Sequence, residues 1–414
     1  EQITPSEKAY AYKMKYDATR KTTVDAWREF RNKCSKRALV IMPVQTGELR
    51  EFAIKNNLFV LNLNKELGDA GAGQNISLLE EVLAWLEPNA PVYGWEQGVS
   101  EDQFVARVSK SGHPMIPCDW SYNHSLLSLL YEKGREQVLP RIFDPRSIDF
   151  KKKKNFVSFF LSDGDNIQWM MQDFASRYYD VPEAEDVKMT FGLPVATLAM
   201  MAPVQFNNLM GLQKQNCSLM EMLGGGYYYV DTYSQDHNRK TNLRVAAKRL
   251  AVSMRQYQIK LLGIMAMDVK SEAAKEAYQV YVDANDQLEG IVVLQYSPYA
   301  GGEGEVFWVT NKAGYDIPVI TVKYSLWDRI HEREGSPDFI ASKLKEEAQE
   351  ESFSVVCVHA WSRFEGDTYG ASAAKRCAER LDDRFEAINM QELVWRLRMS
   401  RRPEQTLDYL NKIY

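Results

Sequence analysis

The feature that most constrains the fold is a series of apolar segments of strand length after residue 150, most of them followed by a segment with helical periodicity. Strands buried on both faces of a parallel sheet are apolar along their whole length, and parallel neighbours need a crossover connection. Eight such repeats over about 260 residues match the size of a (β/α)8 barrel of the TIM type. The eight segments are 155–161, 187–193, 219–223, 261–267, 290–296, 317–324, 353–358 and 385–388.

Two irregularities predict that this barrel is distorted or has seven strands. The third segment, 219–223, is a poor strand. Where the fifth helix should lie, residues 297–316 hold a Gly-rich loop and a strand-like stretch, 306–309. We therefore expect a TIM-like barrel that departs from the regular pattern.

The first part of the chain alternates short strands with helical segments and predicts an open, three-layer α/β domain. A break is expected at Asp144-Pro145 and the four lysines 151–154, which gives an N-terminal domain of residues 1–148 and a C-terminal domain of residues 149–414. The expected strands of the first domain are 38–42, 58–63, 92–95 and 114–117, and its expected helices are 23–36, 48–55, 77–86 and 101–109.

Composition excludes several classes of partner. The net charge is −5, with basic residues spread among acidic ones, so we expect no nucleic-acid partner. The most apolar stretch, 189–204, is interrupted by Gly192 and Pro194 and is shorter than the ~20 residues of a membrane-spanning helix. The chain begins at Glu1, which fits a trimmed sequence or a removed export signal; the second case would favour an extracellular or periplasmic location.

Polar residues directly follow several of the expected barrel strands. Asp163 and Asp165 come after 155–161, and Asp268 comes after 261–267. The carboxyl ends of barrel strands share one face, where such folds place their sites. Cleavage of a glycosidic bond needs two opposed carboxyl groups, so we expect Asp163 or Asp165 to act opposite Asp268. The alternative is that these side chains, like Asn166, only cap the helices that follow.

Other strand ends carry groups that suit a sugar ligand. His359 follows 353–358, where it could donate to a ligand hydroxyl, bind a metal or be buried with its partners. Asn166 and the aromatic residues Tyr296, Trp327 and Trp361 complete the expected substrate-binding set. Glu303 and Glu305 are reserve candidates for the acid. The histidines show no metal-ligand spacing and the five cysteines form no C-x-x-C pair, so neither a metal nor a cofactor is expected.

The segment 224–231 resembles the signature of the GxGYxYP family. Gly224, Gly226, Tyr227 and Tyr229 match, and Val230 stands where the family has proline. Residues 160–166 and 119–123 resemble two further landmarks of the family, so the resemblance covers nearly the whole chain. It implies a glycoside hydrolase with a carbohydrate substrate.

Glycines followed by spaced tyrosines predict a backbone with positive φ or in close contact with a neighbour, followed by phenol rings at a cleft. Tyr227 and Tyr229 therefore join the expected substrate-binding residues. The alternative is that both tyrosines pack against the barrel rim. Two other functions remain open at this point. One is a glycan-binding protein without turnover. The other is a metal-dependent hydrolase, such as a deacetylase, with Asp163, Asp165 and His359 as ligands.

Overall fold

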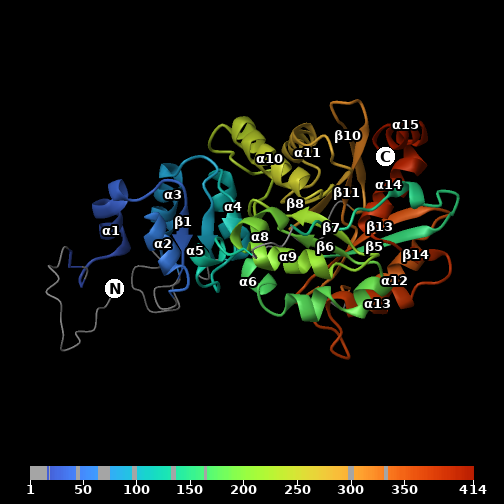
Figure 1. Cartoon of the computed structure of the whole chain (residues 1–414), viewed down its shortest axis with the longest axis horizontal. Helices are drawn as coiled ribbons and strands as arrows, with labels where there is room; N and C mark the ends of the chain where they lie inside the picture. Colours follow the sequence, from blue (N-terminus) through green and yellow to red (C-terminus); the bar gives the residue numbers. More distant parts are fainter. Residues whose placement is uncertain are drawn as a thin grey trace.

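The computed structural model of the chain describes residues 16–17, 19–42, 47–63, 75–95, 100–131, 137–162, 166–296, 303–330 and 334–414. These residues form a four-stranded and a ten-stranded sheet. The smaller sheet, with its helices, occupies one end of an elongated molecule and the larger sheet the other end (Figure 1). The α/β fold class expected from the sequence is confirmed.

The four-stranded sheet is parallel, in the order β2-β1-β3-β4, and has helices on both faces. On β1, Leu39 shares a core with Trp27 of α1, whereas Val40 shares a different core with Ala53 of α2. Successive residues of a strand point to opposite faces, so helices cover both sides and the unit has three layers. Its elements are α1 (Thr23–Phe30), β1 (Leu39–Ile41), α2 (Arg50–Asn56), β2 (Phe59–Leu61), α3 (Asn75–Trp85), β3 (Val92–Gly94), α4 (Glu101–Lys110), β4 (Met115–Ile116) and α5 (His124–Leu127).

The ten-stranded sheet is a distorted barrel-like sheet, in the order β10-β11-β9-β8-β7-β6-β5-β13-β12, and its tenth strand, β14, pairs with β5 outside this order. All its pairs are parallel except β10 with β11. Its strands are β5 (Asn155–Leu161), β6 (Thr190–Leu193), β7 (Ser218–Met222), β8 (Leu261–Ala266), β9 (Gly290–Gln295), β10 (Val306–Thr310), β11 (Asp316–Thr321), β12 (Tyr324–Leu326), β13 (Ser352–Val358) and β14 (Phe385–Ala387).

The distortion has two causes. Strands β11 and β12 are separated by two residues: Val322 N donates to Val293 O of β9, and Lys323 N donates to Val355 O of β13. The first part of this segment thus pairs with β9 and its last part with β13, which links the two arms of the curled sheet. In a regular barrel the eighth strand would separate the seventh from the first, but β13 pairs directly with β5, and β14 pairs only with the first residues of β5. The strand-like stretch that replaces the fifth helix is β10.

Helices also belong to this unit, and all but the last two lie between strands. They are α6 (Ile167–Met170), α7 (Pro182–Asp186), α8 (Val195–Met201), α9 (Pro203–Leu212), α10 (Arg239–Gln256), α11 (Glu272–Ala284), α12 (Pro337–Glu346), α13 (Gly370–Glu379), α14 (Met390–Arg401) and α15 (Pro403–Ile413). Ser336 caps α12, because its Oγ accepts from Phe339 N, and Pro337 is the first helical residue. Among the described helices, none is both long and apolar enough to cross a bilayer.

The segment after β7 joins the two sheets. Tyr227 N donates to Met115 O of β4 (2.6 Å), and Met115 N donates to Tyr227 O (3.0 Å). Two residues further on, Tyr229 forms a parallel bridge with Met265 of β8. The last strand of the small sheet is therefore connected through backbone hydrogen bonds to the centre of the large one. This connection places the carboxyl end of β4 beside the carboxyl edge of the larger sheet.

Candidate active site

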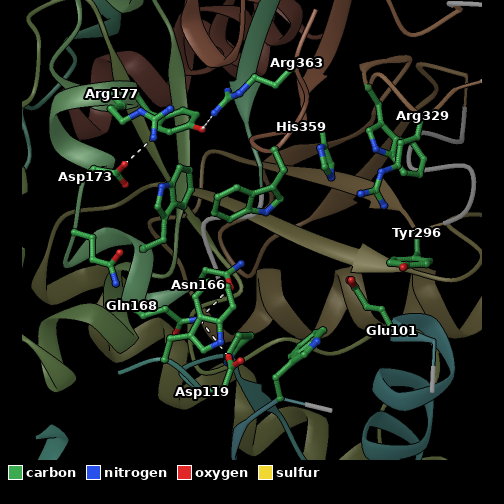
Figure 2. A pocket seen from close by; sticks show the side chains of 18 residues that line it. Glu101, Asp119, Asn166, Gln168, Asp173, Arg177, Tyr296, Arg329, His359 and Arg363 are labelled. Atoms are coloured by element: carbon green, nitrogen blue, oxygen red, sulfur yellow. Dashed lines mark hydrogen bonds and ion pairs between the residues drawn. The ribbon is translucent and has the colours of Figure 1, made fainter. Parts of the chain in front are cut away.

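A cleft of about 620 Å³ opens where the two units meet. Its described walls come from the ends of β3 and β4 on one side and from the segments after β5, β9, β12 and β13 on the other. Figure 2 shows the side chains of the 18 residues that line it. Seven of them are aromatic: Trp95, Trp120, Trp169, Tyr178, Tyr296, Trp327 and Trp361.

Asp119 is a partly buried carboxyl group in this cleft, two residues past Pro117 at the end of the small sheet. Gln168 Nε2 donates to its Oδ1 (3.3 Å). Burial raises the pKa of Asp119 above its ordinary value, and the nearby Glu48 charge adds to this, against the opposing effect of hydrogen bonds to the carboxylate. Asp119 therefore keeps its proton to a higher pH than an ordinary aspartate does, which suits a general acid.

Glu101, the first residue of α4, reaches the cleft from the same unit. Tyr227 Oη donates to Glu101 Oε1 (3.0 Å), and the Tyr227 ring stacks on Trp95 with centroids 6.4 Å apart. Tyr229 meets Tyr296 edge to face at 5.6 Å. The tyrosines of the signature thus hold three side chains that line the cleft.

Tyr227 and Tyr229 themselves lie behind the wall of the cleft. Their exposed fractions are 2% and 0%, and neither is among the described lining residues. Both belong to the core that also contains Met115 and Met265, whereas Tyr228 belongs to the other large core. In this arrangement Tyr227 and Tyr229 hold the cleft residues in position and are not themselves exposed in the cleft.

The wall formed by the segments after β12 and β13 is rich in cations and aromatic rings. Trp327 packs against His359 with ring centroids 5.5 Å apart, and Trp361 packs against Trp169 at 4.7 Å. His359 Nδ1 lies 3.0 Å from the buried Ser362 Oγ, which donates to Asp328 Oδ1. Because that hydroxyl donates to Asp328, it accepts from His359, and the imidazole proton then lies on Nδ1.

The structure brings five of the residues expected from the sequence together in this one cleft: Asn166, Tyr296, Trp327, His359 and Trp361. Asp163 and Asp165 lie outside the described residues; in the chain they fall between Ser162, which follows β5, and Asn166. Their catalytic role remains a prediction.

Asp268 is placed elsewhere. It is exposed and is not among the described lining residues of the cleft. Its Oδ1 accepts from Lys270 N (2.9 Å), and its backbone O accepts from Ser271 Oγ (2.9 Å), at the turn that begins α11. These are the contacts of a turn-forming aspartate. The reserve candidate Glu305 forms an ion pair with Lys270 (3.1 Å).

Several cleft residues were not among those expected from the sequence. They include Trp95, Glu101, Asp119 and Trp120 from the first unit, and Arg177, Arg329 and Arg363 from the second. The rule applied to the large sheet, a polar residue directly after a strand, would also have found Asp119. Within the described part of the chain, no three His, Cys, Asp or Glu side chains gather as a metal ion would require.

Two family models match the chain. Residues 153–398 match the model described as "GxGYxYP putative glycoside hydrolase C-terminal domain", and residues 36–129 match the "GxGYxYP third domain". No curated protein matches the sequence. The fold is similar to that of a crystal structure described as a putative hydrolase from Bacteroides thetaiotaomicron VPI-5482, with a TM-score of 0.76 and 18% identity over 92% of this chain and 69% of the other.

Proposed function

The chain belongs to the GxGYxYP family, and from this premise we propose that it hydrolyses glycosidic bonds in the cleft between its two sheets. The observation that carries the proposal is a partly buried carboxyl group with a raised pKa, Asp119, in a cleft walled by seven aromatic rings. Ligand sites commonly have volumes of about 300–1,000 Å³, and flat aromatic faces suit the apolar faces of sugar rings. The cleft volume of about 620 Å³ leaves room for a short stretch of glycan.

The proposed chemistry uses two carboxyl groups. Asp119 donates its proton to the glycosidic oxygen as the bond from that oxygen to the anomeric carbon breaks. A second, ionised carboxylate either attacks the anomeric carbon or takes a proton from the water that does so, and one water molecule is consumed for each bond cleaved. We assign the second role to Asp163 or Asp165, on the sequence prediction, with Glu101 as the described alternative in the same cleft.

The aromatic and polar residues would bind the glycan. Trp327, Trp361 and Tyr296 offer ring faces for stacking, and Asn166 and His359 offer hydrogen bonds to hydroxyl groups. Tyr227 and Tyr229 contribute indirectly, because they hold Trp95, Glu101 and Tyr296 in place.

The test is a screen of glycans for newly formed reducing ends, with the wild-type protein and Asp119→Asn. Removal of a general acid typically lowers turnover by about 10²–10⁴-fold, and we expect a loss of that size. The matched control is Asp286→Asn, an exposed aspartate in the turn after α11, which should keep wild-type turnover. Wild-type turnover in Asp119→Asn would refute the assignment.

Three further results separate the remaining possibilities. Asp163→Asn, Asp165→Asn and Glu101→Gln, measured one at a time, identify the second carboxylate. Wild-type turnover in Asp163→Asn, Asp165→Asn and Asp268→Asn would remove the residues expected from the sequence. Glycans that are retained but not cleaved would identify a binding protein. Loss of turnover after chelation would identify the metal-dependent hydrolase, since two carboxyl groups need no metal.

A further inference from the structure

We propose that the cleft selects a glycan that carries an anionic group, a carboxylate or a sulfate, and that Arg329 and Arg363 bind this group. The inference rests on the proposed function, because it names the substrate class of the same cleft. Both arginines line the cleft, and both lie on the wall formed by the segments after β12 and β13. A guanidinium presents a planar fork of N–H donors that matches the oxygens of a carboxylate or a sulfate.

Arg363 is held in position before any ligand arrives. Its guanidinium lies over the Tyr369 ring, 3.8 Å from the centroid, and Nη2 donates to Tyr178 Oη (3.1 Å). Its backbone N donates to Asp328 Oδ2 (2.9 Å). Ring stacking and one neutral hydrogen bond fix the group but do not neutralise its charge. Binding an anion would therefore cost little conformational entropy, because the guanidinium of Arg363 is already oriented.

The charges of Arg329 and Arg363 are not compensated by ion pairs within the described part of the chain. Arg177 shows the contrast in the same cleft, since its Nη1 lies 2.8 Å from Asp173 Oδ2. No described carboxylate pairs with Arg329 or with Arg363. Two arginines without a described carboxylate partner, both lining the same cleft, suit an anionic ligand better than a neutral one.

The cleft is also divided by charge. Figure 2 shows Arg363, His359 and Arg329 on its upper side, where the one labelled carboxylate, Asp173, is paired with Arg177, and shows Asp119 and Glu101 on its lower side. Bound with its anionic group toward the arginines, a sugar would keep that group away from the acidic residues that would repel it. The arrangement therefore favours one orientation of an acidic glycan.

The test measures binding to matched pairs of immobilised glycans: oligogalacturonides with their carboxyl-reduced counterparts, and sulfated glycosaminoglycan oligosaccharides with their desulfated counterparts. We expect the wild type to retain the acidic member of at least one pair at least ten-fold more tightly than its neutral partner. Which pair shows the difference tells a carboxylate ligand from a sulfate ligand. Arg329→Gln and Arg363→Gln should each weaken that binding by about 10–100-fold, and Arg363→Lys should recover part of it.

Arg244→Gln is the matched control, because Arg244 is exposed on α10 and does not line the cleft. It should bind like the wild type. Equal affinity for acidic and neutral members, no acidic glycan retained, or unchanged binding in both glutamine variants would each overturn the inference. Acidic glycans that bind but are never cleaved would refute the proposed hydrolysis and still support the binding of an anionic group. Cleavage of neutral glycans alone would support the proposed hydrolysis and overturn the selection of an anionic group.

Discussion

Substitution of Gly226 by alanine tests whether the signature segment is a joint between the two units. Gly226 has φ +113°, and a Cβ there would lie 2.5 Å from Pro114 Cβ and 2.7 Å from Met115 O. Gly225 is the matched control, because it also has a positive φ, +80°, but a Cβ there would meet nothing within 4 Å. Both changes carry the backbone cost of an L-residue at positive φ, about 1–2 kcal/mol. Only Gly226→Ala adds the cost of overpacking, about 1–3 kcal/mol.

We therefore expect the free energy of unfolding to fall by about 1–2 kcal/mol in Gly225→Ala and by about 2–5 kcal/mol in Gly226→Ala. Urea denaturation of both variants beside the wild type measures the difference. Since Met115 is the residue that Tyr227 pairs with, Gly226→Ala should also displace Trp95 and Glu101 and lower turnover further than Gly225→Ala. Equal destabilisation by the two substitutions would refute the hypothesis that the signature segment joins the two units.

Two further predictions concern buried polar groups near that joint. Tyr227→Phe keeps the ring on Trp95 but removes the hydroxyl that donates to Glu101. We therefore expect thermal unfolding to show a free energy of unfolding lower by about 1 kcal/mol, and we expect a lower kcat/KM. An unchanged kcat/KM would show that the position of Glu101 does not depend on this hydrogen bond. Burial raises the pKa of Glu221 from 4.5 to about 8, so between those pH values the folded chain keeps a proton that the unfolded chain releases. The free energy of unfolding of the wild type should therefore fall as pH rises from 5 to 8, and this group should contribute at most about 1.4 kcal/mol per pH unit. Glu221→Gln should lack this contribution to the slope. Identical slopes for the two proteins in urea denaturation at several pH values would contradict the prediction.

The strands of the larger sheet could be predicted because burial on both faces makes them apolar from end to end. Strand β5 has the bounds expected from the sequence. Asn166 and His359 then meet in one cleft for a geometric reason, since the carboxyl ends of parallel strands share one edge. These predictions needed only local patterns and the rule for parallel sheets.

The closure of that sheet could not be predicted, because it depends on pairing between distant segments. The expected strand 317–324 is divided into β11 and β12, and the division changes its partner from β9 to β13. Nothing in the local composition distinguishes the residues before Val322 from those after it. The direct pairing of β13 with β5 is likewise a long-range choice.

The share of the first unit in the cleft was missed for the same reason. Asp119 and Glu101 reach the cleft because Met115 pairs with Tyr227, more than a hundred residues away in the chain. The burial of the signature tyrosines could not be predicted from the local sequence either. In an extended segment Tyr227 and Tyr229 point to one side and Tyr228 to the other, and with three tyrosines in a row the sequence does not show which side is open.

The most direct test of the central claim is the pH dependence of kcat/KM on a glycan that the protein cleaves, measured for the wild type and for Asp119→Asn. Because burial raises the pKa of Asp119, the wild type should keep its protonated acid at higher pH than an exposed aspartate would, and turnover should fall as pH rises through that pKa. We expect this basic limb to disappear in Asp119→Asn and the remaining rate to be at least about 10²-fold lower. A variant with the wild-type rate and the same basic limb would contradict the account.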